Sequence, residues 1–184
     1  MTSTIIAPPE LATGTWVIDP VHSEVAFSVR HLMSKVRGKF TEFEGTIEVA
    51  DNPLDSKTEV TVQIGSVTTG NPQRDADLGT SQYFEVDKYP TMKFVSGGFR
   101  QTGESAFALV GNLTVKDVTK QVELEVDYLG VDQDPWGNTR VGFEASTAIN
   151  RKDFNVTGNV PLNGEKVLIG DQITVTLLVQ AVKQ

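Results

Sequence analysis

The chain contains no cysteine, and this absence removes several kinds of chemistry at once. Disulfide bonds, thiolate metal sites and cysteine nucleophiles are all excluded. Histidine is also scarce: His22 and His31 are the two present, and along one strand they would point to opposite faces. No carboxylate–histidine spacing typical of a zinc site occurs. The sequence therefore predicts no metal and no cofactor.

Sequence signatures of enzymes are missing as well. No serine lies in a nucleophile elbow, and no glycine-rich phosphate loop is followed by a helix. The segment "GEKVLIG" has glycines, but it has neither the spacing nor the following helix of such a loop. We therefore predict that the protein is not an enzyme.

Basic residues are outnumbered, with 16 Lys and Arg against 24 Asp and Glu, for a net charge of -8. For the chain as a whole, this charge opposes binding to nucleic acid and electrostatic docking to membranes. No stretch approaches the roughly 18 apolar residues of a membrane span, so no stable membrane insertion is expected. Residues 1–13 lack a basic region and are interrupted by Pro8 and Pro9. We interpret them as a flexible N-terminal leader rather than a signal peptide and predict a cytoplasmic location.

Alternation of apolar and polar residues is what the chain does have, and it recurs along most of its length. Such alternation is typical of strands with one buried face. The clearest runs lie at residues 24–31, 59–64, 107–115, 121–128, 141–149 and 173–179, with shorter ones at 40–49 and 92–99. Turn-forming segments such as "DNPLD" and "DQDPWGN" separate them. The pattern predicts an antiparallel all-β fold, and both a sandwich and a closed barrel satisfy it.

One segment departs from the strand pattern. Asn71 and Pro72 form the N-cap and first position of a predicted short helix near residues 71–85. The irregular stretch from Gly70 to Pro90 is long for a connection, which indicates a functional role such as opening to admit a ligand.

Several long motifs resemble those of one known family. They are "GTWVIDPVHSEVAFSVRHLMSKVRGKF", "SVTTGNPQRDADL", "YFEVDKYPTMKF", "GNLTVKDVTKQVELEV" and "FEASTAINRKDF". In this order they resemble the YceI-like family of polyisoprenoid-binding, lipocalin-like proteins. The resemblance implies that residues 14–184 form a single domain, an extended antiparallel β-barrel of about eight strands with an apolar tunnel. It also implies binding, storage or transport of a long-chain ligand, an isoprenoid quinone or polyprenyl lipid first of all.

With this background, the inward-facing residues become candidate ligand contacts, although each is equally compatible with an ordinary core. Aromatic rings suit a polyprenyl chain because they offer flat apolar area at low entropic cost. The apolar candidates are Phe27, Val29, Phe40, Phe43, Phe84, Met92, Phe94, Leu113, Phe143 and Phe154.

Three polar candidates accompany the apolar ones. His31 continues the apolar row of its strand, either as a histidine bonded to a backbone carbonyl or as a donor to a ligand headgroup. Arg74 and Arg151 either tie down their loops or lie at the tunnel rim, where they would meet a phosphate or carbonyl. We hypothesise that His31, Arg74 and Arg151 converge near one mouth of the tunnel.

Two other functions remain open on the sequence alone. One is a carrier of fatty acids or fatty amides, and the other is a solid-core β domain that binds proteins and holds no ligand. A homodimer is also compatible with the sequence.

Overall fold

The computed structural model describes residues 11–160, 162 and 167–184. In this part of the chain, eleven strands form one antiparallel sheet, accompanied by the helix α1 (Pro72–Leu78). The strands are β1 (Gly14–Ile18), β2 (Glu24–His31), β3 (Ser34–Phe40), β4 (Phe43–Val49), β5 (Lys57–Gln63), β6 (Val67–Thr68), β7 (Thr91–Gln101), β8 (Ala106–Val115), β9 (Val118–Gln133), β10 (Thr139–Asn150) and β11 (Ile169–Lys183). Short 3-10 turns lie at Pro53–Asp55, Ile64–Ser66 and Arg151–Phe154.

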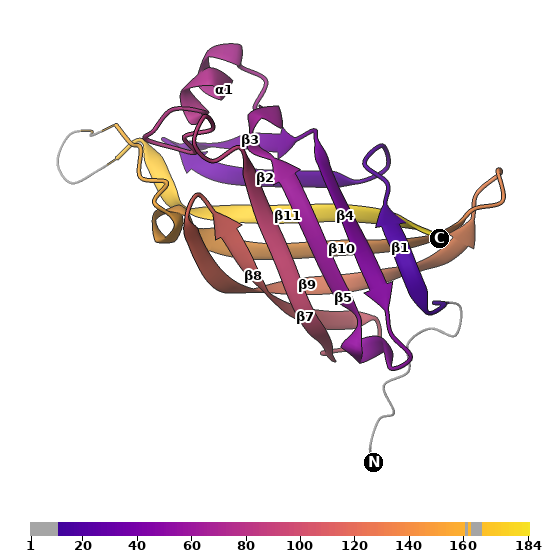
Figure 1. Ribbon diagram of the computed structural model, residues 1–184. Helices are drawn as coiled ribbons and strands as arrows, with labels where there is room; N and C mark the ends of the chain where they lie inside the picture. The colour runs from indigo at the N-terminus through magenta and orange to yellow at the C-terminus, as the bar shows by residue number, and fades with distance from the viewer. Residues whose placement is uncertain (1–10, 161, 163–166) are drawn as a thin grey trace.

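The sheet closes into a barrel because β1 pairs with two strands, β4 and β11 (Figure 1). The closed ring contains eight strands in the order β1-β4-β5-β7-β8-β9-β10-β11, which confirms the predicted barrel. The remaining strands, β2, β3 and β6, extend from the first part of β11. Strand β11 therefore pairs with β2 near its start and with β1 near its end. The two ends of the barrel are thus built from different sets of strands.

The predicted helix is present but shorter than residues 71–85. Asn71 caps α1 by accepting a hydrogen bond from the Arg74 amide, and Pro72 occupies the first turn. The helix ends at Leu78, and Gly79 follows it as the C-cap. The next residues form turns instead, closed by backbone bonds such as that from the Val86 amide to the Gly79 carbonyl.

The solid part of the core lies where β1 closes the ring. Trp16, Val141 and Ala181 are almost completely buried there, together with Ile47 and Val49. The Trp16 indole donates to the Ala12 carbonyl at 2.9 Å, which satisfies its buried polar atom. Of the predicted leader, residues 1–10 lie outside the described residues, whereas Leu11 packs against this core.

An ion-pair cluster ties the β9–β10 turn to the end of β1. Arg140 in β10 donates to the Asp19 carboxylate at 2.7 Å and to the Asp134 carboxylate at 2.8 Å. Burial alone would raise the pKa of both carboxyl groups, but the hydrogen bonds from Arg140 and from neighbouring donors outweigh it. The pKa of each is lowered to about 2.

Substituting Arg140→Gln should make the protein more sensitive to acid. Because the pKa values of Asp19 and Asp134 are lower when folded, these carboxylates stabilise the fold above pH 4 and lose that effect towards pH 2. Without Arg140 both pKa values rise, so the midpoint of acid unfolding should move up by about one pH unit. Tryptophan fluorescence during acid titration measures this midpoint. Arg100→Gln is the control, since its exposed pair with Glu123 should contribute little. An equal shift in both variants would contradict the assignment.

Candidate functional site

The other part of the barrel is hollow. A cavity of about 660 Å³ lies inside it, a volume within the range of roughly 300–1,000 Å³ seen for ligand pockets. Its walls are the inward-facing rows of the strands. In β11, for example, Ile173, Val175 and Leu177 line the cavity while Thr174 and Thr176 are exposed outside. Alternation thus produces an apolar lining and a polar exterior from the same strands.

The inward-facing side chains are only partly buried, although they point into the protein. Phe27, Val29, Ile173 and Val175 all retain accessible surface, unlike Trp16 and Val141 in the solid core. Protein interiors are normally close-packed, with few voids larger than a water molecule. The exposed surface of these four residues therefore faces the cavity and is available to a ligand.

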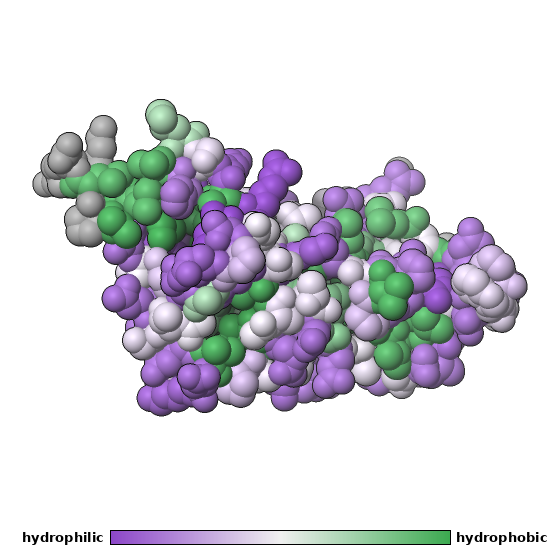
Figure 2. All heavy atoms as spheres, turned by 90° about the horizontal axis from the view of Figure 1, so that it is seen from above, coloured by the Kyte–Doolittle hydropathy of each residue, from purple (hydrophilic) through white to green (hydrophobic). Residues whose placement is uncertain are grey.

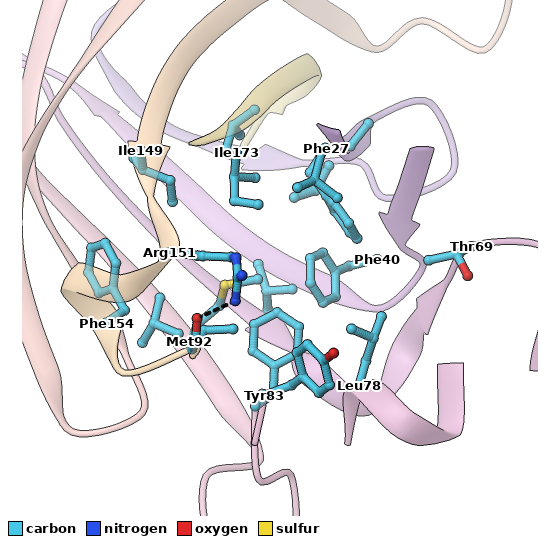
Figure 3. A pocket seen from close by; sticks show the side chains of 18 of the residues that line it. Phe27, Phe40, Thr69, Leu78, Tyr83, Met92, Ile149, Arg151, Phe154 and Ile173 are labelled. Atoms are coloured by element: carbon cyan, nitrogen blue, oxygen red, sulfur yellow. Dashed lines mark hydrogen bonds between the residues drawn. The ribbon is translucent and has the colours of Figure 1, made fainter. Parts of the chain in front are cut away.

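Aromatic rings form one wall of the cavity. Phe40 lies 5.5 Å from Phe27 and 6.0 Å from Phe84, measured between ring centroids, and the second pair is nearly edge-to-face. Through Phe84, the segment that follows α1 packs onto the barrel. The α1 region therefore covers this side of the cavity (Figure 3), and Figure 1 shows α1 lying against the outside of the barrel.

Gly38 in β3 provides the space for the Phe27 ring. A Cβ atom at this position would lie 2.4 Å from Phe27 Cζ. We expect Gly38→Ala to push the ring into the cavity, weakening ligand binding about threefold to tenfold and lowering Tm by a few degrees. Titration with a fluorescent polyene fatty acid and thermal denaturation measure the two effects. Gly97→Ala is the control because nothing lies within 4 Å of a Cβ there. Unchanged binding by Gly38→Ala would contradict the expectation.

Arg151 is a buried charge beside this apolar space. It lies in the turn after β10 and is 4% exposed. Its Nε donates to the Gly170 carbonyl at 2.9 Å, and Nη1 donates to the carbonyls of Val156 and Gly158 at 2.8 and 2.9 Å. Nη2 is buried and has no hydrogen-bond partner, and no carboxylate among the described residues pairs with Arg151. Figure 3 shows the guanidinium among apolar side chains of the cavity.

Arg74 fastens α1 to the barrel. Its Nε donates to Thr69 Oγ1 at 2.7 Å and its Nη2 to the Thr69 carbonyl at 2.9 Å. The carboxylate of Asp75 accepts from the amide and hydroxyl of the same threonine. Arg74 touches the cavity, but these contacts give its guanidinium a structural role in holding the covering helix.

His31 is the last residue of β2 and lines the end of the cavity. Within the part of the chain that the structure describes, no hydrogen bond to its ring is present. His31 pairs with Ile169 at the start of β11, and the next residue, Gly170, accepts the bond from Arg151. His31, Arg74 and Arg151 therefore line the same cavity, and His31 and Arg151 both lie beside the start of β11.

All the predicted site residues except Phe143 line the cavity. Phe143 lies nearer the solid core around Trp16 and borders a separate small pocket. Its ring centroid is 5.8 Å from that of Tyr128. Its place on an inward row was read correctly, but the row continues into packed core. Tyr83 was missed because it lies in an irregular segment without periodicity, and its ring packs over Gly158.

Among residues 11–160, 162 and 167–184, no group of three or more His, Asp or Glu side chains is placed to hold a metal ion. Within the same residues, no helix has the length and apolar character required to cross a membrane.

Comparison with known proteins agrees with this geometry. The YceI-like domain family matches residues 16–181. The chain belongs to the YceI-like family. Protein YceI of Salmonella arizonae is 38% identical over 151 residues, which cover 80% of this chain and 78% of the relative. The resemblance read from the sequence motifs is thereby confirmed.

Two solved structures share the YceI-like barrel. BcnA of Burkholderia cenocepacia has a TM-score of 0.76 at 19% identity, covering 89% of this chain and 98% of BcnA. A polyisoprenoid-binding domain from Saccharophagus degradans, implicated in plant cell wall breakdown, has a TM-score of 0.69 at 15% identity, covering 94% and 100%. At these identities the likeness shows the fold alone.

Proposed function

We propose that this YceI-like protein binds one long-chain apolar ligand inside its barrel, and that the ligand is an isoprenoid quinone or another polyprenyl lipid. The observation that carries the proposal is the cavity itself, whose inward-facing side chains are left only partly buried. The polyisoprenoid-binding description of a protein with the same fold supports it. The cavity also favours a carrier over a solid-core domain, because a solid core would leave no such space.

Apolar burial is sufficient to explain tight binding. At about 0.3 kcal/mol per ligand atom, a chain of ~40 carbons would gain about 12 kcal/mol, which corresponds to nanomolar affinity. Such burial discriminates poorly between chains, because one methylene more or less changes the energy only slightly. Selectivity must therefore come from polar groups that meet the headgroup.

Arg151 is the group best placed to select the headgroup. Its Nη2 atom is buried and unpaired, which is costly, and a ligand oxygen would satisfy it once the neighbouring lining side chains move aside. A quinone carbonyl, an amide oxygen, a carboxylate or a phosphate would each supply one, and the last two would also compensate the buried charge. The fatty-acid or fatty-amide carrier therefore stays as the alternative, because the same atom would bind its headgroup.

The mechanism we propose is passive. The ligand enters where α1 and residues 79–90 cover the cavity, and the apolar walls then hold its chain out of water. Storage and transport use the same binding step and are both consistent with it. No catalytic step is proposed. The cytoplasmic location and the homodimer stay predictions, which cell fractionation and analytical ultracentrifugation would test.

The experiment that tests the proposal is extraction of the purified protein with organic solvent, followed by mass spectrometry. A stoichiometric polyprenyl quinone or polyprenyl lipid would support the proposal and identify the cargo. A fatty acid or fatty amide would support a carrier but replace the proposed ligand with the alternative. Recovery of no lipid, together with failure to load any long-chain lipid afterwards, would overturn the proposal.

A further inference from the structure

The hairpin that joins β2 to β3 ends in two exposed apolar residues. Met33 is 100% exposed and Leu32 is 45% exposed. The Leu32 amide donates to the Leu168 carbonyl, and the Leu168 amide donates to the carbonyl of Val160, which is 49% exposed. These side chains make one apolar tip at one end of the barrel, where Figure 2 shows hydrophobic side chains gathered.

The turn sequence does not suit the turn geometry. Leu32 has a φ of 55°, in the left-handed region that favours glycine and asparagine. Met33 has no positive φ, and two-residue hairpin turns with a positive φ at the first position alone usually have glycine there. Leu-Met at this position is thus unfavourable for both the backbone and the solvation of the side chains. Neither the turn geometry nor burial thus accounts for these two apolar side chains.

The outward face of the same hairpin is basic. Arg30, Lys35, Arg37 and Lys39 are all exposed, and residues 25–41 contain no acidic side chain. Pairing of Arg30 with Lys35 places these two directly opposite each other. Among the described residues, none of the four basic side chains forms an ion pair.

Neighbouring elements do not neutralise this face. The outward residues of the adjacent part of β11 are Gln172, Thr174 and Thr176, which carry no charge. In the part of the chain that the structure describes, the carboxylates closest in sequence to these elements are Glu24 at the far end of β2, Glu42 two residues after β3, and Asp171, which pairs with Lys152. A chain with a net charge of -8 thus presents a local patch of the opposite sign.

The apolar tip also lies beside the cavity. His31, Val160, Leu168 and Ile169 all line the cavity. Val160 itself belongs to the tip, His31 directly precedes Leu32, and the Leu168 carbonyl accepts from the Leu32 amide. In Figure 1 this end of the barrel is on the left, opposite the β9–β10 hairpin in orange. A surface that contacts the tip would therefore lie next to the residues that line this end of the cavity.

We propose that the β2–β3 hairpin docks reversibly on the surface of a bilayer containing anionic lipids. Leu32 and Met33 enter the headgroup region, while Arg30, Lys35, Arg37 and Lys39 face the lipid headgroups. The net negative charge of the chain repels an anionic membrane, but salt screens this repulsion beyond about 10 Å. The basic side chains of the hairpin lie closer than this to the headgroups when the hairpin touches the membrane, so their attraction is screened less. This docking extends the proposed function, because it would bring the cavity to the source of its ligand.

Vesicle flotation tests the proposal with the ligand-free protein, so its result does not depend on what the cavity binds. We expect flotation with vesicles of phosphatidylcholine and phosphatidylserine, weaker flotation with phosphatidylcholine alone, and loss of flotation at high salt. Leu32→Gly with Met33→Ser should reduce the bound fraction at least tenfold. This variant should fold well, since glycine suits the positive φ at the first position of the turn. Replacing Lys35, Arg37 and Lys39 by Gln should remove the difference between the two vesicle types.

Trp136→Gln is the matched control, because Trp136 is 78% exposed on the β9–β10 turn at the opposite end. Flotation should be unchanged in this variant, and an equal loss would overturn the proposal. Absence of flotation of the unmodified protein with either vesicle would also overturn it. So would a dimer that becomes monomeric in the Leu32 and Met33 variant without any vesicle binding, since a second copy would then cover the tip.

Discussion

Replacing Val175 by tryptophan is expected to abolish ligand binding while stabilising the empty protein. Val175 lies in the middle of the cavity wall, paired with Phe27 of β2 on one side and Thr147 of β10 on the other. An indole in this empty space removes the room for a ligand chain and buries apolar surface. Filling a cavity typically adds about 0.5–2 kcal/mol, and each kcal/mol raises Tm by about 2–4 °C in a chain of this size.

The two expected effects have opposite signs, which distinguishes a hollow barrel from a packed one. In a packed core the same substitution would cost about 1–3 kcal/mol or more. Thermal denaturation of delipidated protein and titration with a polyprenyl phosphate measure stability and binding. Thr176→Trp is the control, since its side chain is exposed on the outside of the same strand. A lower Tm for Val175→Trp with retained binding would contradict the cavity assignment.

Alternation predicts which side chains point inward but not whether opposite walls meet. The rows containing Val29 and Phe143 look alike in sequence, yet one lines the cavity and the other reaches packed core. The difference depends on how the wall is assembled along the barrel. At one end β11 pairs with β1 and the interior is filled, whereas nearer its start it pairs with β2 and the interior is open. Such long-range pairings leave no local pattern.

Strand boundaries were less predictable than strand faces. Residues 40–49 read as one run, but β3 ends at Phe40 and β4 begins at Phe43. Thr41 and Glu42 join the two, held by bonds to the Ser66 carbonyl and hydroxyl. Because the partner that ends each strand is more than twenty residues away, periodicity within the run did not reveal the break.

The polar site was predictable in its members but not in their roles. Arg74 and Arg151 look equivalent as basic residues in irregular segments. In the structure the Arg74 guanidinium binds Thr69, while Arg151 keeps one buried nitrogen without a partner. That distinction depends on which carbonyls the fold brings within reach, which composition and spacing do not specify.

Substituting Arg151→Lys should therefore weaken binding of ligands with an acceptor headgroup by about 10–100-fold. Hydrogen bonds to charged groups contribute about 1.5–3 kcal/mol, and lysine cannot present the planar set of donors that guanidinium provides. Binding of a polyprenyl hydrocarbon without a headgroup should change less than about threefold, since the apolar walls are intact. Loss of bonds to the carbonyls of Gly170, Val156 and Gly158 should also lower Tm by several degrees.

The ratio of the two affinities separates headgroup recognition from a general loss of structure. Competition titrations with a polyprenyl phosphate and with the hydrocarbon of the same length give this ratio for each variant. Arg74→Lys is the matched control, because Arg74 also lines the cavity but donates to Thr69. In the control both ligands should weaken together or not at all, since any effect would act through α1. If Arg151→Lys weakened both ligands equally, its role would be to hold the three carbonyls, and headgroup selection would have to come from another residue.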